Sequence, residues 1–223
     1  MRVISLNVAT PRLITWRGET FSTGIFKQPV QDAGKVRLRK LNFDGDRQAD
    51  LTVHGGPLKA VYAYPSEHYP LWRDELAEDD EAQTVLKTWG AFGENLTTEG
   101  MTEDNVQIGD QFRIGSALVM AVQPRQPCFK LAAKFDRDDV IDRMMENGRS
   151  GIYFSVLEEG DVQAGDEITR VAGRESSVSV AEVNRLISSD RLNVGLLRRA
   201  SQVDELPEGY LRRFRSRLAQ LER

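Results

Sequence analysis

The sequence has very few of the residues from which disulfides and metal sites are built. Its 223 residues include one cysteine, Cys128, and two histidines, His54 and His68. One cysteine cannot form an internal disulfide, which agrees with a reducing compartment. A structural zinc site needs three or four ligands, so the same shortage argues against zinc.

Long apolar stretches are also missing. No run approaches the roughly 18 apolar residues that a membrane span needs. The first residues, 1–6, are typical of a strand and lack the long apolar core of a cleaved leader. The formal net charge of -4 gives no indication of a general nucleic-acid or membrane surface. We therefore expect a cytoplasmic protein that binds neither membranes nor nucleic acid.

Several common ligand-binding motifs do not occur. There is no Gly-x-Gly-x-x-Gly fingerprint, no phosphate-loop lysine motif and no Gly-x-Ser-x-Gly elbow. The acidic stretch that starts at Asp44 resembles a calcium loop, but Ala49 stands where the loop needs glycine and Gly55 where it needs glutamate. These absences exclude the standard dinucleotide, nucleoside triphosphate, α/β-hydrolase and EF-hand sites.

The distribution of apolar residues predicts two parts. Before residue 173, short apolar runs are separated by turn residues, which predicts a mainly β domain over 1–172. The expected strands lie in 3–8, 36–41, 60–64, 111–122, 151–157 and 166–171. One helix is expected from about residue 65 to 76. After residue 173 the pattern becomes helical, which predicts a second domain over 173–223.

Three helices are expected in this second part. Ser179 and Glu182 have the spacing of a capping box before an apolar stripe. A second helical pattern covers 190–200, and a third begins with Pro207 at a typical first-turn position. The apolar stripes of the three helices could serve an internal bundle or a homodimer.

Cys128 stands in a constrained and cationic segment. Pro124 and Pro127 limit the backbone on the amino-terminal side of the cysteine. Arg125 and Lys130 would favour thiolate over thiol, and the thiolate attacks electrophiles or binds soft metals. The alternative is that the thiol is a small buried core group, as free cysteines often are.

Two glycine-containing segments could contribute to a ligand site. Residues 54–60 combine two glycines with an imidazole and an ammonium, which makes a plausible anion cradle, although Gly-Gly is also an ordinary turn. Residues 93–95 offer a carboxylate and an amide in a second loop. The candidates in these two segments are His54, Gly55, Gly56, Lys59, Glu94 and Asn95.

Taken together, these segments resemble MOSC domain proteins of the YiiM type, a family linked to resistance against N-hydroxylated purines. The matching segments appear in the family's order: 27–30, 44–50, 54–60, 92–96, 109–110 and 124–130. The resemblance covers about residues 1–172, and the terminal helices resemble the three-helix extension of that group.

The resemblance implies a MOSC-type β-barrel with peripheral helices that binds a molybdenum pterin cofactor. Cys128 would ligate molybdenum, since a thiolate is a soft donor. The anionic and polar edges of the cofactor would be held by Lys59, Arg125, Lys130 and His54, with the backbone of Gly55 and Gly56 close by. Asn95 and Glu94 would orient cofactor or substrate, and Lys27 would be a weaker addition.

The implied reaction is the two-electron reduction of an N-hydroxylated base or amine to the parent amine, with release of water. His54 would donate a proton, because its ordinary pKa lies near neutrality. No flavin or iron-sulfur motif occurs in the sequence, so a separate reductase would deliver the electrons. Two alternatives stay open: a sulfur carrier with a persulfide on Cys128, and a non-enzymatic module that carries the pterin cofactor.

Overall fold

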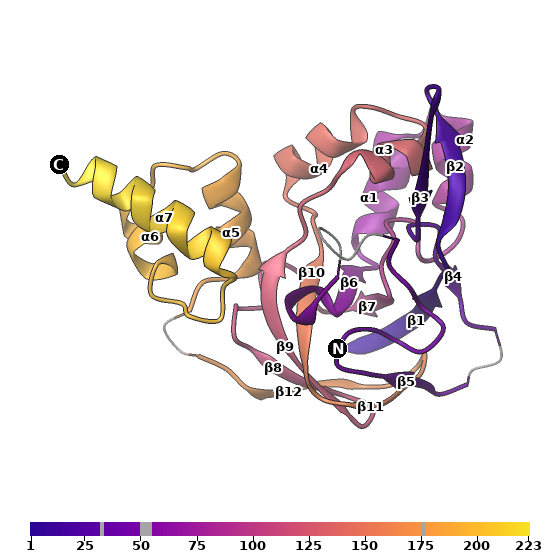
Figure 1. The fold of residues 1–223 in the computed structure, drawn as a ribbon, viewed down its shortest axis with the longest axis horizontal. Helices are drawn as coiled ribbons and strands as arrows, with labels where there is room; N and C mark the ends of the chain where they lie inside the picture. The colour runs from indigo at the N-terminus through magenta and orange to yellow at the C-terminus, as the bar shows by residue number, and fades with distance from the viewer. Residues whose placement is uncertain (32–33, 50–54, 175–176) are drawn as a thin grey trace.

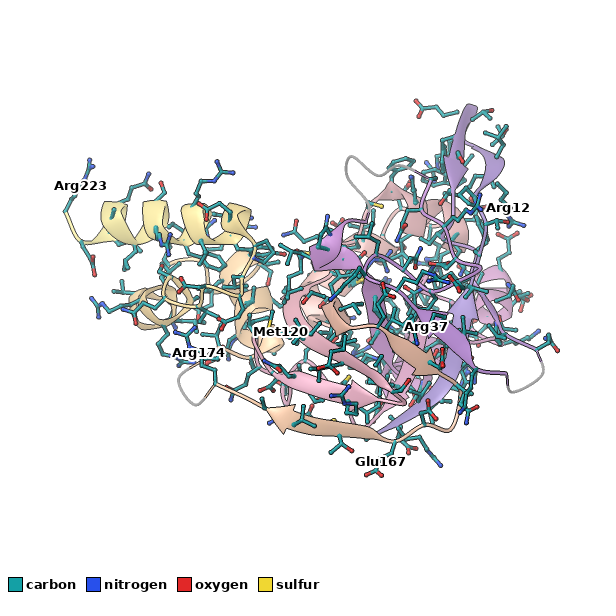
Figure 2. All side chains as sticks on the ribbon, turned by 60° about the horizontal axis from the view of Figure 1, so that its bottom comes forward. Arg12, Arg37, Met120, Glu167, Arg174 and Arg223 are labelled. Carbon is teal, nitrogen blue, oxygen red and sulfur yellow. The ribbon has the colours of Figure 1, made fainter. Side chains whose placement is uncertain are left out.

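The protein is organised around a curled sheet, with helices at two of its sides. The structure is a computed structural model that describes residues 1–31, 34–49, 55–174 and 177–223. Four helices and a hairpin lie together on one side of the sheet, and the C-terminal helices lie on another side (Figure 1). Arg12 in the hairpin and Arg223 at the C-terminus mark opposite ends of the molecule (Figure 2).

The central sheet has eight strands in the order β12-β8-β9-β10-β6-β7-β1-β4. Neighbouring strands are antiparallel except β6 and β7, which are parallel. A turn that contains Gly115, at a φ of 54°, divides the single run expected over 111–122 into two strands. The strands are β1 Arg2–Val8, β4 Gln28–Pro29, β6 Val61–Pro65, β7 Leu96–Glu99, β8 Gln111–Ile114, β9 Ala117–Pro124, β10 Ile152–Glu158 and β12 Ile168–Ala172.

The prediction of a closed β-barrel is wrong. Strands β12 and β4 are the two edges of the sheet, and no ladder between described residues joins them. The sheet curls, because Ile168 N donates to Met1 O at 2.8 Å and Val3 N donates to Asp166 O at 2.9 Å. It does not close, since the pairing between β1 and the start of β12 is one isolated bridge, Arg2 with Glu167, and no ladder forms between the described parts of these strands. Two small sheets flank it: β11 Gly160–Val162 with β5 Val36–Leu38, and β2 Arg12–Trp16 with β3 Glu19–Thr23.

The fold is also not mainly β, because the described residues form seven α-helices. The helix expected over 65–76 is α1 His68–Glu75; it begins later than expected because residues 61–65 form β6. Three more helices in the first part escaped prediction, since six to eight residues are too few to establish a helical period. They are α2 Asp80–Val85, α3 Phe129–Phe135 and α4 Val140–Asn147, and a short 3-10 helix, η1, spans Pro57–Lys59.

The three C-terminal helices are confirmed as α5 Val180–Ile187, α6 Val194–Ala200 and α7 Glu208–Leu221. Both bonds of the predicted capping box are present: Glu182 N donates to Ser179 Oγ, and Ser179 N donates to the Glu182 carboxylate. Pro207 is the residue before α7 and not its first helical residue. The capping bonds satisfy N–H groups that the first turn of a helix leaves without an intrahelical partner.

The C-terminal helices pack directly on the sheet. Val183, Leu197 and Phe214 belong to the same buried cluster as Val119 and Phe154 of the sheet. The helices and the sheet therefore share one continuous core. Burial of each such side chain stabilises the folded state by about 1.5–3 kcal/mol. The division at residue 172 stays a prediction.

Among the described helices, none combines the length and apolar character that crossing a bilayer requires.

Candidate active site

Cys128 lies at the junction between a strand and a helix. Strand β9 ends at Pro124, and α3 begins directly after the cysteine, whose backbone is extended with φ -135° and ψ 170°. Its carbonyl accepts a hydrogen bond from Leu131 N at 2.8 Å in the first turn of α3. Cys128 is half-buried and lines a cleft. The thiol is therefore not a buried core group.

The cleft is lined by basic and aromatic side chains. Its empty volume is about 630 Å³, including the open mouth. None of the described residues that line it is Asp or Glu. The cations of the lining are Lys27, Arg47, Lys59, Arg125 and Lys130. Such a lining attracts anionic ligands.

Arg125 forms part of the cleft wall and is held rigidly. Its Nη1 donates to Phe92 O at 2.6 Å and to Tyr62 Oη at 3.3 Å, and its guanidinium carbon lies 4.8 Å from the centre of the Tyr62 ring. Burial works against the charge of Arg125, but the side chains of Tyr62, Tyr153 and Cys128 outweigh it and raise the pKa of the guanidinium. Arg125 therefore supplies a permanent positive charge close to Cys128.

Lys27 and Asn95 also line the cleft, but both are committed to Asp46. The Lys27 ammonium forms an ion pair with buried Asp46, whose carboxylate also accepts from Asn95 Nδ2 at 2.9 Å and Ala9 N at 2.8 Å. Asn95 Oδ1 accepts from Tyr62 N at 3.2 Å. Burial lowers the pKa of Lys27 against the attraction of Asp46. The ion pair offsets the charge of Lys27. The positive electrostatic potential of the cleft therefore comes mainly from the other cations of its lining.

Glu94 does not line the cleft. Its side chain is fully buried, and its carboxylate accepts from Gly90 N at 2.9 Å, Phe92 N at 3.0 Å, Thr97 Oγ1 at 2.9 Å and Tyr69 Oη at 2.5 Å. The structure therefore does not support the expected contact of Glu94 with cofactor or substrate. It places Glu94 as the anchor of the loop whose carbonyl at Phe92 holds Arg125.

The Gly-Gly segment meets the cleft at one edge. Gly55 and Gly56 both have positive φ values, 106° and 86°, which favour glycine. Gly55 and Lys59 line the cleft, and together with Gly56 they also line an adjoining groove. His54 lies outside the described residues, so its predicted role stays a prediction.

Two tyrosines of the cleft were missed by sequence reasoning. Tyr62 on β6 and Tyr153 on β10 face each other in the sheet register, and their ring centres are 5.2 Å apart. Tyr62 Oη donates to Ser150 O at 2.8 Å. Burial raises the pKa of both hydroxyls, so both stay neutral. Each residue sits in an apolar run that was expected to be a strand, and only the pairing of the strands brings them together.

Lys134 on α3 was also missed and lies behind the wall of the cleft. Its ammonium donates to Ile25 O at 2.9 Å and to Gly90 O at 2.5 Å, and thereby joins two loops. Burial lowers the pKa of Lys134 to about 7, against the opposing attraction of Glu94. The spacing of Lys134 on its short helix carried no signal of this position.

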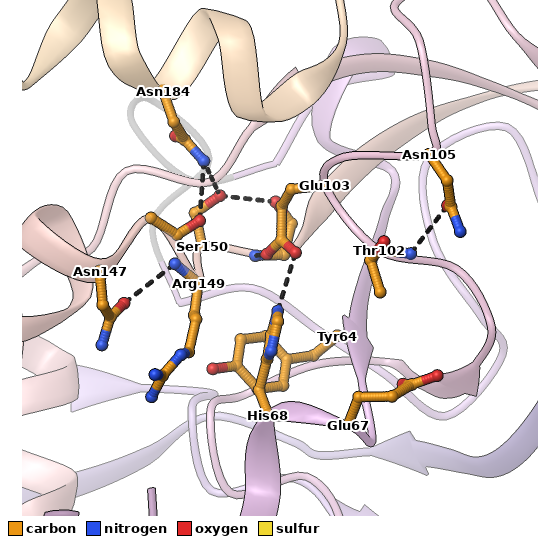
Figure 3. Close-up of polar contacts among 12 residues, drawn as sticks. Tyr64, Glu67, His68, Thr102, Glu103, Asn105, Asn147, Arg149, Ser150 and Asn184 are labelled. Carbon is orange, nitrogen blue, oxygen red and sulfur yellow. Dashed lines mark hydrogen bonds and ion pairs between the residues drawn. The ribbon is translucent and has the colours of Figure 1, made fainter. Parts of the chain in front are cut away.

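The second histidine belongs to a different cluster, shown in Figure 3. His68 Nε2 lies 2.8 Å from Glu103 Oε2, and Glu103 Oε1 accepts from Gly151 N at 2.6 Å. Asn184 of α5 donates to Ser150 Oγ at 2.8 Å in the same network. His68 does not line the cleft of Cys128. A Cys-His pair with His68 is therefore not formed.

Comparison with known proteins gives the family. The MOSC domain family matches residues 50–169. The chain belongs to the MOSC domain family. The YiiM-like 3-alpha helix domain matches residues 178–221, which contain α5, α6 and α7. MOSC domains are associated in general with binding of the molybdenum cofactor.

Three relatives illustrate the range of similarity. "Protein YiiM" of Escherichia coli (strain K12) is 44% identical over 153 residues, which cover 69% of this chain and 66% of that protein. The crystal structure of YiiM from Geobacillus stearothermophilus has a TM-score of 0.77 and 33% identity over 97% of this chain and 98% of that chain. A protein of Gibberella moniliformis (strain M3125 / FGSC 7600) named "Reductase" is 34% identical over 187 residues, 83% of this chain but only 32% of that protein.

The donor set of the cleft fits a molybdenum pterin cofactor. Among the described residues, no group of three or more His, Cys, Asp and Glu side chains is placed to hold a metal. A metal that arrives with its own sulfur ligands needs only one more soft donor, which Cys128 can provide. The remaining cations and the two aromatic walls suit a phosphate and a planar ring.

Proposed function

We propose that the cleft holds a molybdenum pterin cofactor and reduces N-hydroxylated bases or amines to the parent amines. The observation that carries this proposal is that Cys128 shares one cleft with Lys59, Arg125 and Lys130, in a chain of the MOSC family. When bound, the cofactor supplies the two-electron redox chemistry. Two electrons and two protons convert the hydroxylamino group to an amine and one water molecule.

In this proposal the residues of the chain bind and orient the cofactor and the substrate. Cys128 is the protein ligand to the metal in this proposal, and the cations balance the phosphate of the pterin. The backbone near Gly55 allows close approach because no side chain intervenes. The rings of Tyr62 and Tyr153 form part of the cleft lining and offer an apolar surface to the planar pterin. The expected proton donor is His54.

The electrons must come from a redox centre outside the cleft. We propose that a separate reductase delivers them. The Gibberella protein named "Reductase" has most of its length outside the region that matches this chain. This supports a scheme in which electrons enter from residues beyond the MOSC-type part. A homodimer and a cytoplasmic location stay predictions.

The test is turnover by the protein purified from a host that makes the cofactor. With a chemical reductant, the protein should convert a hydroxylaminopurine to the aminopurine, and Cys128→Ser should not. Complete inertness of the cofactor-loaded protein would overturn the proposal. Sulfane sulfur on Cys128 without metal would favour the sulfur carrier instead, and cofactor binding that is indifferent to Cys128→Ser would favour a non-enzymatic carrier module.

A further inference from the structure

The segment before Cys128 is anchored on two opposite sides. On the inner side, Arg125 N donates to Gly151 O at 3.3 Å and its guanidinium donates to Phe92 O at 2.6 Å. On the outer side, Gln126 Nε2 donates to the hydroxyl of Tyr210 on α7 at 3.0 Å. A residue of the C-terminal helical region therefore touches the chain two positions before the thiol.

Tyr210 is well placed to act as an anchor. The residue is buried, with 8% of its surface exposed, and its ring centre lies 5.9 Å from that of Phe214 in the core. Its hydroxyl donates to Pro124 O at 3.5 Å while it accepts from Gln126. Burial raises the pKa of Tyr210 to about 12, so the hydroxyl keeps its proton at neutral pH. One hydroxyl thus binds two points of the cysteine segment.

We propose that Tyr210 is a positioning residue for Cys128, and that the C-terminal helices fix the sulfur in the cationic cleft through the Tyr210–Gln126 contact. Gln126 is exposed, so without Tyr210 its amide would turn to water. Pro127 restricts the backbone of Gln126 to extended conformations and fixes its own φ. The backbone between the Gln126 amide and the thiol therefore has little conformational freedom. A displacement of Gln126 would displace Cys128 as well.

The position of the contact agrees with this role. Tyr210 and Gln126 line a groove beside the cleft, and the two hollows share Gly55 and Lys59 as a common wall. The start of α7 therefore lines the groove that adjoins the cleft of Cys128. The position of the thiol does not depend on the proposed reduction. Only its importance for catalysis rests on that proposed function.

The test uses the chemistry of the only thiol in the chain. The rate of alkylation of Cys128 is measured with anionic iodoacetate and with neutral iodoacetamide, in the native and in the urea-unfolded protein. The cations of the cleft should raise the iodoacetate-to-iodoacetamide ratio of the native wild type above that of the unfolded chain. In Tyr210→Phe this ratio should fall toward the value of the unfolded chain, because a thiol displaced from the cations loses part of their field.

Matched variants separate positioning from general stability. Gln126→Met keeps the size of the side chain and should reproduce the effect, while the double variant should be no worse than either single one. Gln220→Met, an exposed position near the end of α7, should leave the ratio unchanged. An unchanged ratio in Tyr210→Phe, an equal fall in Gln220→Met, or additive effects in the double variant would each overturn the proposal. Because the readout is thiol alkylation, its failure is distinguishable from a failure of the proposed reduction.

Discussion

Replacement of Glu94 by glutamine tests whether this residue is part of the scaffold or a ligand contact. The buried carboxylate accepts four hydrogen bonds, two from backbone N–H groups of Gly90 and Phe92 and two from hydroxyls of Tyr69 and Thr97. Glutamine has nearly the same shape, so it changes charge and hydrogen bonding without leaving a cavity. We expect Glu94→Gln to destabilise the fold.

The magnitude follows from the bonds that glutamine cannot make. Among the described residues Phe92 N is the only donor to Oε2, so an amide NH2 at that position would face another N–H and leave a buried donor unsatisfied. This costs about 1–3 kcal/mol, and the three bonds to Oε1 change from charge-assisted to neutral, each with a loss of up to about 1 kcal/mol. The relief from burying a neutral group offsets part of this, and we expect a net loss of about 3 kcal/mol.

The assay is thermal and urea unfolding of purified Glu94→Gln beside the wild type. A loss of about 3 kcal/mol lowers Tm by roughly 6–12 °C in a chain of this size. Glu99→Gln is the matched control, because Glu99 pairs with Arg2 at the surface and both side chains are more than half exposed. A Glu94→Gln variant with wild-type stability but weakened cofactor binding would refute the assignment of Glu94 to the scaffold.

Three further predictions concern groups around the cleft. Asp46→Asn leaves the Lys27 ammonium buried without its counter-ion, and should lower the unfolding free energy in urea by about 3 kcal/mol. The double variant with Lys27→Met should recover much of this loss. Stability losses of the two single variants that simply add in the double variant would contradict this. Because the folded-state pKa of Lys134 is lowered to about 7 from 10.5, the unfolded chain binds more protons within that pH window, and stability contributed by this group rises with pH. Lys134→Met should therefore reduce the gain in unfolding free energy between pH 7.5 and 9.5 by about 2.5 kcal/mol, and an unchanged gain would count against it. Gly93→Ala places a Cβ 2.7 Å from Ile25 Cγ1, whereas Gly18→Ala meets nothing within 4 Å at a similar φ, so the first should cost about 1–3 kcal/mol more than the second; equal costs would contradict the packing at Gly93.

The sequence predicted most of the long elements because their signals are local. The capping box at Ser179 and the apolar stripes after it identify the C-terminal helices, and the run from residue 151 identifies β10. Closure of the sheet is not local, since it depends on how many residues of β1 and β12 pair, and these strands lie far apart in the sequence. The family resemblance suggested a barrel, but β1 and the start of β12 form one isolated bridge and no ladder between the described residues.

The site was predictable where one segment carried the chemistry and not where several strands had to converge. Cys128, Arg125 and Lys130 are close in sequence and share one cleft. Tyr62 and Tyr153 meet only because β6 pairs with β10. Glu94 follows a glycine in a polar loop, which resembles a ligand-binding pattern, but the fold turns its carboxylate inward to four donors. No local pattern distinguishes these two uses of a loop carboxylate.

The central claim is that Cys128 holds a molybdenum pterin cofactor in the cationic cleft. The most direct measurement is the molybdenum and pterin content per chain of wild type and Cys128→Ser, purified in parallel from a host that makes the cofactor. We predict molybdenum together with pterin in the wild type and loss of molybdenum in Cys128→Ser, while the cofactor-free forms of the two proteins unfold at the same temperature. Equal molybdenum in both proteins, or none in the wild type while pterin is bound, would contradict the account.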